Sequence, residues 1–306
     1  MEIFRKEVSP MIRELPYFTI GDSYGSNQDW LTDPIMKLGG CGAVTACDLC
    51  IYLAKYYGAK SLVPFDVDKL DKETYIAFAQ KMKPYLHPRW KGINTLEAWM
   101  DGFQRYLGDC AEAAGQSPIA GMRPVHKEIL WPDAGKAITA QIDAGMPLPT
   151  MILHHQDKRF EDYEWHWFLL NGYTRTDDGH ILVKAVTYSE ARWLPLDKLW
   201  LTGRDLEDGG VVLLDRSAAF AHAVTAEFGT VKGRQSAFSA GCRPFDTHTF
   251  GYRRSSSSRP SLNIRIISLV RLMLSHCSWI SLRGTQMAVF SSLVSMWIVG
   301  SPSTSQ

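Results

Sequence analysis

The sequence lacks a hydrophobic run at its start and has no excess of charge of one sign. Residues 1–20 mix acidic and basic side chains with apolar ones, so the apolar core of roughly 7–15 residues that defines a secretory signal is absent. The formal net charge of the 306 residues is +1, which is neither the basic footprint of a nucleic-acid-binding protein nor the charge of an acidic solvating tail. We therefore expect a cytoplasmic protein that does not bind nucleic acid.

Cysteine is scarce, and its spacing does not form a disulfide framework. Three of the six cysteines, Cys41, Cys47 and Cys50, fall within ten residues, so we expect reduced thiols. Cys47 and Cys50 have the spacing of half a zinc site, but zinc takes four ligands and there is no second pair, so we interpret both as core packing. His154 and His155 also lack a suitably spaced partner and are expected in a solvent-facing turn. Since the Walker and Rossmann glycine patterns are absent too, the sequence predicts no metal and no cofactor.

The C-terminal part differs in composition from the rest of the chain. Residues 233–306 contain eight arginines, no lysine and one acidic residue, a net charge of +7, which leaves residues 1–232 with −6. The uncharged segment 285–300 is too short and too rich in serine for a membrane helix, which needs about 20 apolar residues. We predict that residues 1–232 form the domain. Residues 233–306 are expected to be a Ser/Arg-rich tail, either out of frame or flexible, and the one part that could contact a membrane.

The stretch 38–58 combines a glycine-flanked cysteine with an apolar helix. Gly39, Gly40 and Gly42 leave space around Cys41 and permit the positive φ values of a sharp turn. Apolar residues then recur on both sides of the following helix, which predicts that it is buried. The unpaired amides and the dipole at a helix N-terminus stabilise a thiolate, so Cys41 is a candidate nucleophile. The alternative is a small buried hydrophobic residue beside a turn.

A candidate partner for this cysteine opens a later apolar run. Residues 164–173 read Glu-Trp-His-Trp-Phe-Leu-Leu-Asn-Gly-Tyr, which predicts a buried strand that ends in a glycine turn. His166 stands at the mouth of this strand, and a Cys/His pair needs adjacency in the fold rather than in the sequence. Trp165 and Trp167 are expected in the core, or one of them in the wall of a cleft.

Together these two stretches resemble papain-like cysteine peptidases, most nearly their bacterial C39-like branch. The resemblance covers about residues 17–215 and implies an α+β, two-lobe fold in which a central buried helix carrying the Cys packs against an antiparallel sheet carrying the His. Papain-like enzymes also carry a Gln upstream of the nucleophile. Gln28 matches it, and a side-chain amide shortly before Cys41 can donate to an oxyanion, with Asn27 as a substitute.

The third member of the family's site departs from the pattern. The stretch Asn-Ser-Trp-Gly of papain-like enzymes lines up best with residues 186–189, Val-Thr-Tyr-Ser, and valine cannot orient a histidine. Thr187 is our preferred residue for orienting the ring, with Ser189 as the alternative. Asn171 is expected to point away from His166, because the two are five residues apart on one strand.

The remaining pattern predicts a helical lobe followed by a sheet lobe. Residues 1–37 are rich in proline and glycine and predict an irregular lead-in. The helical lobe is expected over about 38–115, a connector over 111–132 and the sheet lobe over about 133–215, with Asp133 as a helix cap. The predicted strands are residues 146–153, 165–173, 180–188 and 211–214.

The sequence therefore predicts a cysteine-dependent hydrolase that acts on a peptide or amide substrate. Cys41 would attack as a thiolate paired with His166, which then protonates the leaving amine. An acyl or aminoacyl transferase on the same scaffold shares this chemistry up to the acyl-enzyme. The missing Asn at Val186 keeps a catalytically silent binding module open as well.

Overall fold

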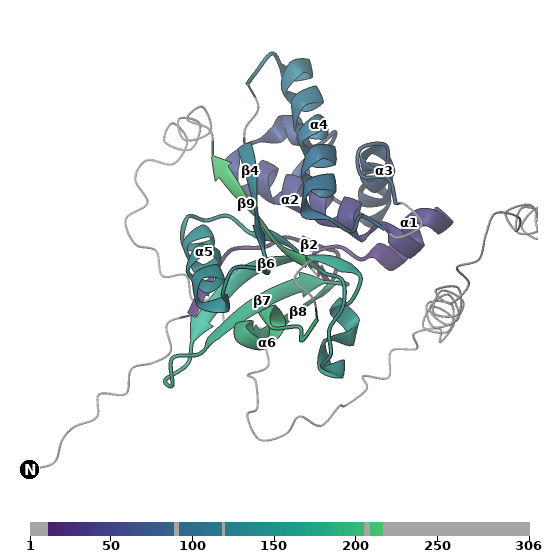
Figure 1. Cartoon of the computed structure of the whole chain (residues 1–306). Helices are drawn as coiled ribbons and strands as arrows, with labels where there is room; N and C mark the ends of the chain where they lie inside the picture. The colour runs from purple at the N-terminus through teal and green to yellow at the C-terminus, as the bar shows by residue number, and fades with distance from the viewer. Residues whose placement is uncertain (1–11, 89–91, 118–119, 205–208, 217–306) are drawn as a thin grey trace, which may run out of the picture. The chain divides into compact units, whose positions relative to one another are not determined.

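An antiparallel sheet of seven strands lies at the centre of the fold, which Figure 1 shows as a computed structural model. The structure describes residues 12–88, 92–117, 120–204 and 209–216, all within a unit that spans residues 1–245. The combination of helices with an antiparallel sheet confirms the expected α+β class. The predicted tail lies outside the described residues, so its nature stays a prediction.

Strand β6 is paired along both of its edges. The main path of the sheet is β4 (Ala120–His126), β9 (Gly209–Arg216), β5 (Leu148–Ile152), β6 (His166–Arg175), β7 (Ile181–Thr187) and β8 (Glu190–Pro195). The first half of β6 pairs with β5, with His166 opposite Ile152. Its second half pairs with β1 (Ile12–Glu14), with Thr174 opposite Ile12, and β7 runs along the other edge. Two short strands, β2 (Thr19–Ile20) and β3 (Ser23–Tyr24), form a separate hairpin.

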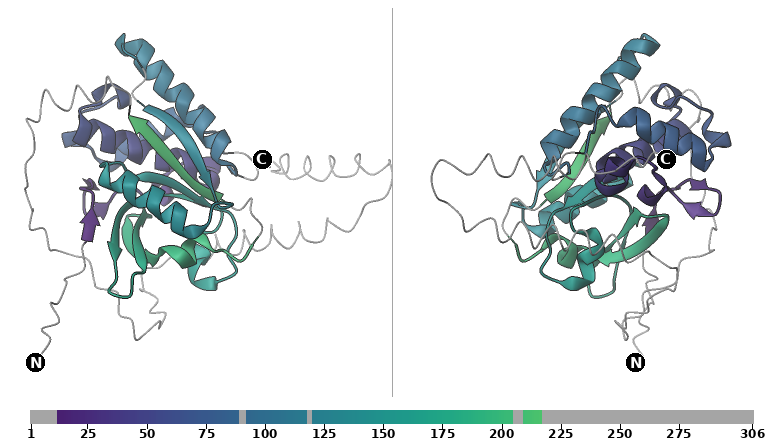
Figure 2. Two further views of the ribbon diagram at one scale, coloured as in Figure 1. Left: turned by 60° about the vertical axis from the view of Figure 1, so that its left-hand side comes forward. Right: turned by 90° about the vertical axis from the view of Figure 1, so that its right-hand side faces the viewer.

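Helices pack on both faces of the sheet. They are α1 (Pro34–Gly39), α2 (Cys41–Tyr57), α3 (Lys72–Met82), α4 (Leu96–Ala114), α5 (Trp131–Asp143) and α6 (Leu196–Trp200), with the short 3-10 turns η1 (Gln28–Trp30), η2 (Lys60–Leu62), η3 (Val67–Lys69) and η4 (Lys158–Tyr163). Trp167 of β6 stacks on Trp99 of α4, whereas Leu170 of β6 lines a small cavity with Ile138 of α5 and Leu199 of α6. Because side chains alternate along a strand, these contacts lie on opposite faces. Figure 2 shows α4 lying along β4 and β9, which it contacts.

Helix α2 is buried over almost its whole length, as the sequence predicts. Every residue from Cys41 to Ala54 is buried except Val44, because α2 packs against β6 and β5 of the sheet and against α3. The helix ends at Gly58, whose φ of +70° is the left-handed C-cap conformation that glycine adopts without strain.

Two glycines determine where this helix starts and how closely it packs. Gly40 joins α1 to α2, and a Cβ there would meet the backbone carbonyl of Met36. A Cβ at Gly42 would lie 3.1 Å from Ile93 and 3.2 Å from Trp99. A side chain at position 40 would clash with backbone, and one at position 42 would force its neighbours to shift, so the glycines allow the start of α2 to pack tightly against the rest of the fold.

The N-terminal part and the connector contain more structure than the sequence predicts. Residues 12–37, expected to be irregular, include β1, β2, β3 and the start of α1. The expected connector, residues 111–132, includes the end of α4 and the whole of β4. Pro124 argues against a strand, but β4 is an edge strand, where a missing N–H is tolerated. Helix α5 starts at Trp131, so Asp133 lies in its first turn and is not its cap.

All four predicted strands are present with shifted bounds, as β5, β6, β7 and β9. Strand β8 follows β7 after a two-residue turn and was not predicted. Among the described residues, no helix combines the length and the apolar character needed to cross a bilayer.

We expect Gly40→Ala to destabilise the fold, whereas Gly108→Ala on α4 should not. A Cβ at position 40 meets the backbone of Met36, and a Cβ at position 108 meets no atom within 4 Å. Overpacking should lower the free energy of unfolding of Gly40→Ala by about 1–3 kcal/mol. The better helix propensity of alanine should raise that of Gly108→Ala by up to about 1 kcal/mol. Denaturant unfolding followed by circular dichroism measures both, and equal changes in the two variants would contradict the proposed clash.

Candidate functional site

The thiol of Cys41 lies where the start of α2 meets the start of β6. Trp99 donates its Nε1–H to the carbonyl of Gly42 at 2.9 Å and stacks on Trp167 with ring centroids 5.2 Å apart. The backbone N–H of Trp167 is close enough to the Cys41 sulfur to lower its pKa. The structure thus places the sulfur beside the backbone of the residue that follows His166.

Burial raises the pKa of the Cys41 thiol. The residue is 6% exposed, and loss of solvation disfavours the thiolate. The backbone N–H groups of Trp167, Gly42 and Cys41 lower the pKa, but by less than burial raises it. The sequence predicted a stabilised thiolate from the helix N-terminus alone. That direction was wrong, because burial outweighs the amides.

The His166 ring is buried, and one of its nitrogens is hydrogen-bonded. Nε2 lies 2.7 Å from Oγ1 of Thr187, the residue that the sequence favoured for orienting the ring. Burial lowers the pKa of His166 from 6.5 to about 3, so the ring is neutral at physiological pH. Within the described part of the chain, no hydrogen bond joins the imidazole to Cys41. The resting site therefore holds a neutral thiol and a neutral imidazole, not the predicted ion pair.

Three residues with a left-handed backbone lie next to His166 in the sequence or in the turn that packs against its ring. Trp165, Tyr188 and Ser189 have φ values of +52°, +50° and +63°, and no other non-glycine residue of the described chain has a positive φ. Tyr188 and Ser189 form the turn between β7 and β8, and the Tyr188 ring stacks on the imidazole at 4.7 Å with an angle of 11° between the planes. Such conformations persist where the surroundings impose them, often at functional sites. Their clustering marks this histidine as a site candidate.

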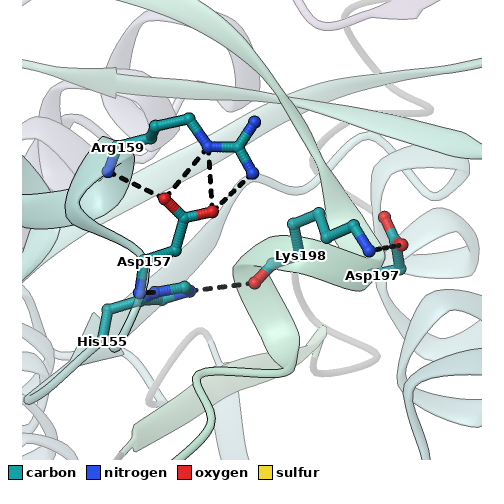
Figure 3. Close-up of polar contacts among 5 residues, drawn as sticks. All are labelled: His155, Asp157, Arg159, Asp197 and Lys198. Atoms are coloured by element: carbon teal, nitrogen blue, oxygen red, sulfur yellow. Dashed lines mark hydrogen bonds and ion pairs between the residues drawn. The ribbon is translucent and has the colours of Figure 1, made fainter.

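The loop before His166 is held by a buried histidine, as Figure 3 shows. His155 accepts the N–H of Asp157 at Nδ1 (3.0 Å), so its Nε2–H donates to the carbonyl of Lys198 at 2.9 Å. The backbone N–H of His155 donates to Glu164 at 2.7 Å. The predicted solvent-facing turn was wrong for His155, which is 6% exposed because its ring bridges two segments of the chain.

Trp165 and Trp167, which flank His166, have different environments. Trp167 is 2% exposed and belongs to the core, as predicted, whereas Trp165 is 39% exposed. Cys47 and Cys50 are fully buried in α2, which confirms their interpretation as core packing. The described ranges contain no group of three or more His, Cys, Asp or Glu side chains that could hold a metal ion.

Gln28, the predicted oxyanion donor, already uses its N–H groups elsewhere. Its Nε2 lies 2.9 Å from the carbonyl of Lys37 and 3.4 Å from that of Met36, at the end of α1. Its Oε1 is buried without a hydrogen-bond partner. Asn27 caps η1 through Oδ1, which accepts the N–H of Asp29 at 2.8 Å. In this arrangement Gln28 stabilises the end of α1.

The other candidates for orienting His166 bond to different groups. Ser189 donates its backbone N–H to the carbonyl of Ser26 at 2.8 Å, and its Oγ is buried without a partner. Asn171 donates to the hydroxyl of Tyr24 at 3.2 Å. Of the three candidate orienting residues, Thr187 is therefore the one bonded to the ring.

Asp48 is the residue at this site that sequence reasoning missed. It lies on α2, is 7% exposed, and accepts hydrogen bonds from the hydroxyls of Tyr17 (3.0 Å) and Tyr75 (2.9 Å) and from Ser26. Burial raises its pKa from 3.8 to about 6, although these hydrogen bonds act in the opposite direction. The signal in the sequence is a carboxylate in an otherwise apolar stretch of helix.

We expect Asp48 and His166 to give the stability of the fold opposite pH dependences. The folded chain holds a proton on Asp48 up to about pH 6 that the unfolded chain releases near pH 3.8, so stability is lost as the pH rises through this window. The unfolded chain binds a proton on His166 below pH 6.5 that the folded chain takes up only near pH 3, so stability is lost as the pH falls through that window. The two contributions are on the order of 3 and 5 kcal/mol.

Thermal unfolding between pH 4 and 7 measures both effects. Relative to the wild type, the melting temperature of Asp48→Asn should rise as the pH increases from 4 to 6, and that of His166→Gln should rise as the pH decreases from 6.5 to 4. Differences from the wild type that do not change with pH would show that neither group has the shifted pKa.

Comparisons with known proteins returned no match. No protein-family model, no curated protein and no solved structure matches this chain. The candidate site therefore rests on the geometry around Cys41 and His166, and the likeness of its motifs to papain-like peptidases remains an expectation from the sequence.

Proposed function

We propose that this chain is a cysteine-dependent hydrolase with a papain-like, two-lobe arrangement, and that it cleaves a peptide or amide bond. The observation that supports it most is the hydrogen bond between Nε2 of His166 and Oγ1 of Thr187, because His166 precedes Trp167, whose backbone N–H approaches the Cys41 sulfur. With Nε2–H as the donor in this bond, the lone pair of Nδ1 is left to take up a proton. Helix α2 would supply the nucleophile and β6 the base.

The shifted pKa values favour a reaction between neutral groups. His166 Nδ1 would take the thiol proton of Cys41 while the sulfur attacks the carbonyl carbon, and the imidazolium would then pass this proton to the leaving nitrogen. The C–N bond breaks, the amine leaves and the acyl group stays on sulfur as a thioester. Water, deprotonated by the imidazole, would release the carboxylic acid and restore the thiol.

The oxyanion of this reaction needs donors near the sulfur. The backbone N–H groups of Cys41, Gly42 and Trp167 face the sulfur, and we assign the oxyanion to this region first. Gln28 would join it by exchanging its longer hydrogen bond, the one of 3.4 Å to the carbonyl of Met36.

A catalytically silent binding module is the second candidate. It is favoured by the lack of a hydrogen bond between the thiol and the imidazole in the described chain, and by the low exposure of Cys41 (6%) and His166 (5%). A substrate would have to reach both groups for the hydrolase to work. The two functions differ in whether Cys41 can be acylated.

We expect p-nitrophenyl acetate, a small activated ester, to acylate Cys41 in a burst of p-nitrophenolate. His166→Gln should lower the acylation rate by about 100-fold or more, because it removes the general base. Thr187→Val should lower it by about tenfold through the lost hydrogen bond, whereas Thr187→Ser keeps the hydroxyl and should stay close to the wild type. Stopped-flow absorbance gives the rates, and mass spectrometry of the peptide that contains Cys41 locates the acyl group.

Slow acylation that is shared with Cys110 and unaffected by His166→Gln would contradict the hydrolase and support the silent module. Glycinamide added as an amine acceptor separates hydrolysis from transfer. Acetate as the main product indicates a hydrolase, and acetylglycinamide as the main product indicates an acyl transferase.

A further inference from the structure

Hydrogen bonds lead from the helix that carries Cys41 to the turn between β7 and β8. They start at Asp48, which lies seven residues, or about two turns, after Cys41 on α2. Its Oδ2 accepts the hydroxyl of Tyr17 at 3.0 Å and its Oδ1 that of Tyr75 at 2.9 Å. The hydroxyl and the backbone N–H of Ser26 lie close enough to this carboxyl to lower its pKa, and a Cβ on the neighbouring Gly25 would lie 3.4 Å from its Oδ2. Residues from three other parts of the chain, Tyr17, Ser26 and Tyr75, thus contact one carboxylate on α2.

The segment at residues 25–26 is fixed between α2 and the turn. Ser26 is 4% exposed, and its carbonyl accepts the backbone N–H of Ser189 at 2.8 Å. Gly25 has a φ of +74°, and a Cβ there would lie 2.8 Å from the Tyr17 ring. Only glycine allows this close approach, which brings Ser26 within reach of Asp48 on one side and of the turn on the other.

The β7–β8 turn contacts the imidazole of His166. Thr187 immediately precedes it and provides Oγ1 to Nε2 of His166, and Tyr188 within it stacks on the ring. Tyr188 and Ser189 both have the left-handed backbone of a two-residue hairpin turn, a conformation that favours glycine or asparagine, so contacts with neighbours help to hold these two residue types in it. The bond from Ser189 to Ser26 is one such constraint.

We propose that Asp48 is a positioning residue that holds Ser26 against the β7–β8 turn and thereby fixes the orientation of the His166 ring relative to the thiol on its own helix. The catalytic meaning of this role rests on the proposed function, whereas the positioning itself does not. Within the described residues, Asp48 is the acidic side chain on this path from α2 to the turn.

A carboxylate suits this role better than an amide. Four donors converge on Asp48, and its two oxygens offer about four lone-pair positions with no proton to place. Asparagine would offer one oxygen, and its own N–H groups would face the donors. An amide should therefore loosen the hold on Ser26 even where it fills the same volume.

The ionisation of Asp48 makes the link measurable at His166. The groups that face the carboxyl are Tyr17, Ser26, Cys47 and Tyr75. None of them is cationic, so burial dominates and the pKa of Asp48 is about 6. Below that pH the carboxyl is protonated. Its own O–H then faces the surrounding donors, and it can accept one hydrogen bond fewer. The pKa of His166 is about 3, outside this window, so a change near pH 6 at its ring would report on Asp48.

The test is ¹⁵N NMR of the imidazole of His166 as a function of pH, in the intact chain without substrate. We expect the wild-type ring signals to show an inflection near pH 6 that disappears in Asp48→Asn and becomes weaker in Ser26→Ala. Cys50→Ala is the matched control, since Cys50 is also buried on α2 but neighbours Cys110 and Tyr106 of α4. This variant should lower the melting temperature and keep the inflection. The acylation rate with p-nitrophenyl acetate should fall by about tenfold in Asp48→Asn.

An inflection that persists unchanged in Asp48→Asn would show that His166 itself titrates, and would overturn the proposal. An inflection that is absent from the wild type would overturn it as well. If Asp48→Asn does not fold, Ser26→Ala decides, because ring signals identical to the wild type would refute the link. A wild type that shows the inflection but is not acylated would refute the hydrolase and leave the positioning role supported.

Discussion

The close approach of α2 to β6 is the constraint on which the rest of the site depends. Gly42 permits it, because any larger residue would press on Trp99 and Ile93. The two tryptophans that fill the contact are satisfied, since Trp99 donates to the carbonyl of Gly42 and Trp167 donates to that of Ile93 at 2.7 Å. The same approach sets the Cys41 sulfur against the backbone of β6 and buries it. The close packing of α2 on β6 therefore determines both the position of the Cys41 thiol and its raised pKa.

Three non-glycine residues near the imidazole, Trp165, Tyr188 and Ser189, have a left-handed backbone. Left-handed conformations of non-glycine residues cost on the order of 1–3 kcal/mol each, so three of them take up a substantial part of a net stability of about 5–15 kcal/mol. Glycine would remove the strain at Tyr188, but it would also remove the ring that stacks on His166. The backbone bonds from Trp165 to Leu153 (3.0 Å) and from Ser189 to the neighbouring segment help to keep the strained residues in place. At Tyr188, this cost accompanies a side chain that stacks on the His166 ring.

The sequence predicted the parts of this structure whose signals are local. Helix α2 is framed by glycines and β6 is a continuous apolar run, and both were found close to their predicted bounds. Edge strands were missed because pairing, not composition, makes them strands, and Pro124 in β4 even argued against one. The contact of Thr187 with His166 could be anticipated from an alignment of motifs. The role of Asp48 and the raised pKa of Cys41 could not, since both come from burial, which only packing determines.

Burial also decides how a proton could move in this site. The pKa of the thiol is raised from 9.0 and that of the imidazole is lowered to about 3, so at least six pH units separate them. Transfer of the proton before any reaction would cost upwards of about 8 kcal/mol. Attraction within the resulting ion pair returns about 4 kcal/mol at 4 Å and an effective dielectric constant near 20, which does not close the gap. The remaining cost of about 4 kcal/mol would favour a reaction at Cys41 in which the proton moves while the new bond forms. Such a step depends on a well-oriented base, which explains why the orientation of His166 by Thr187 and the strained turn would matter more than a preformed thiolate.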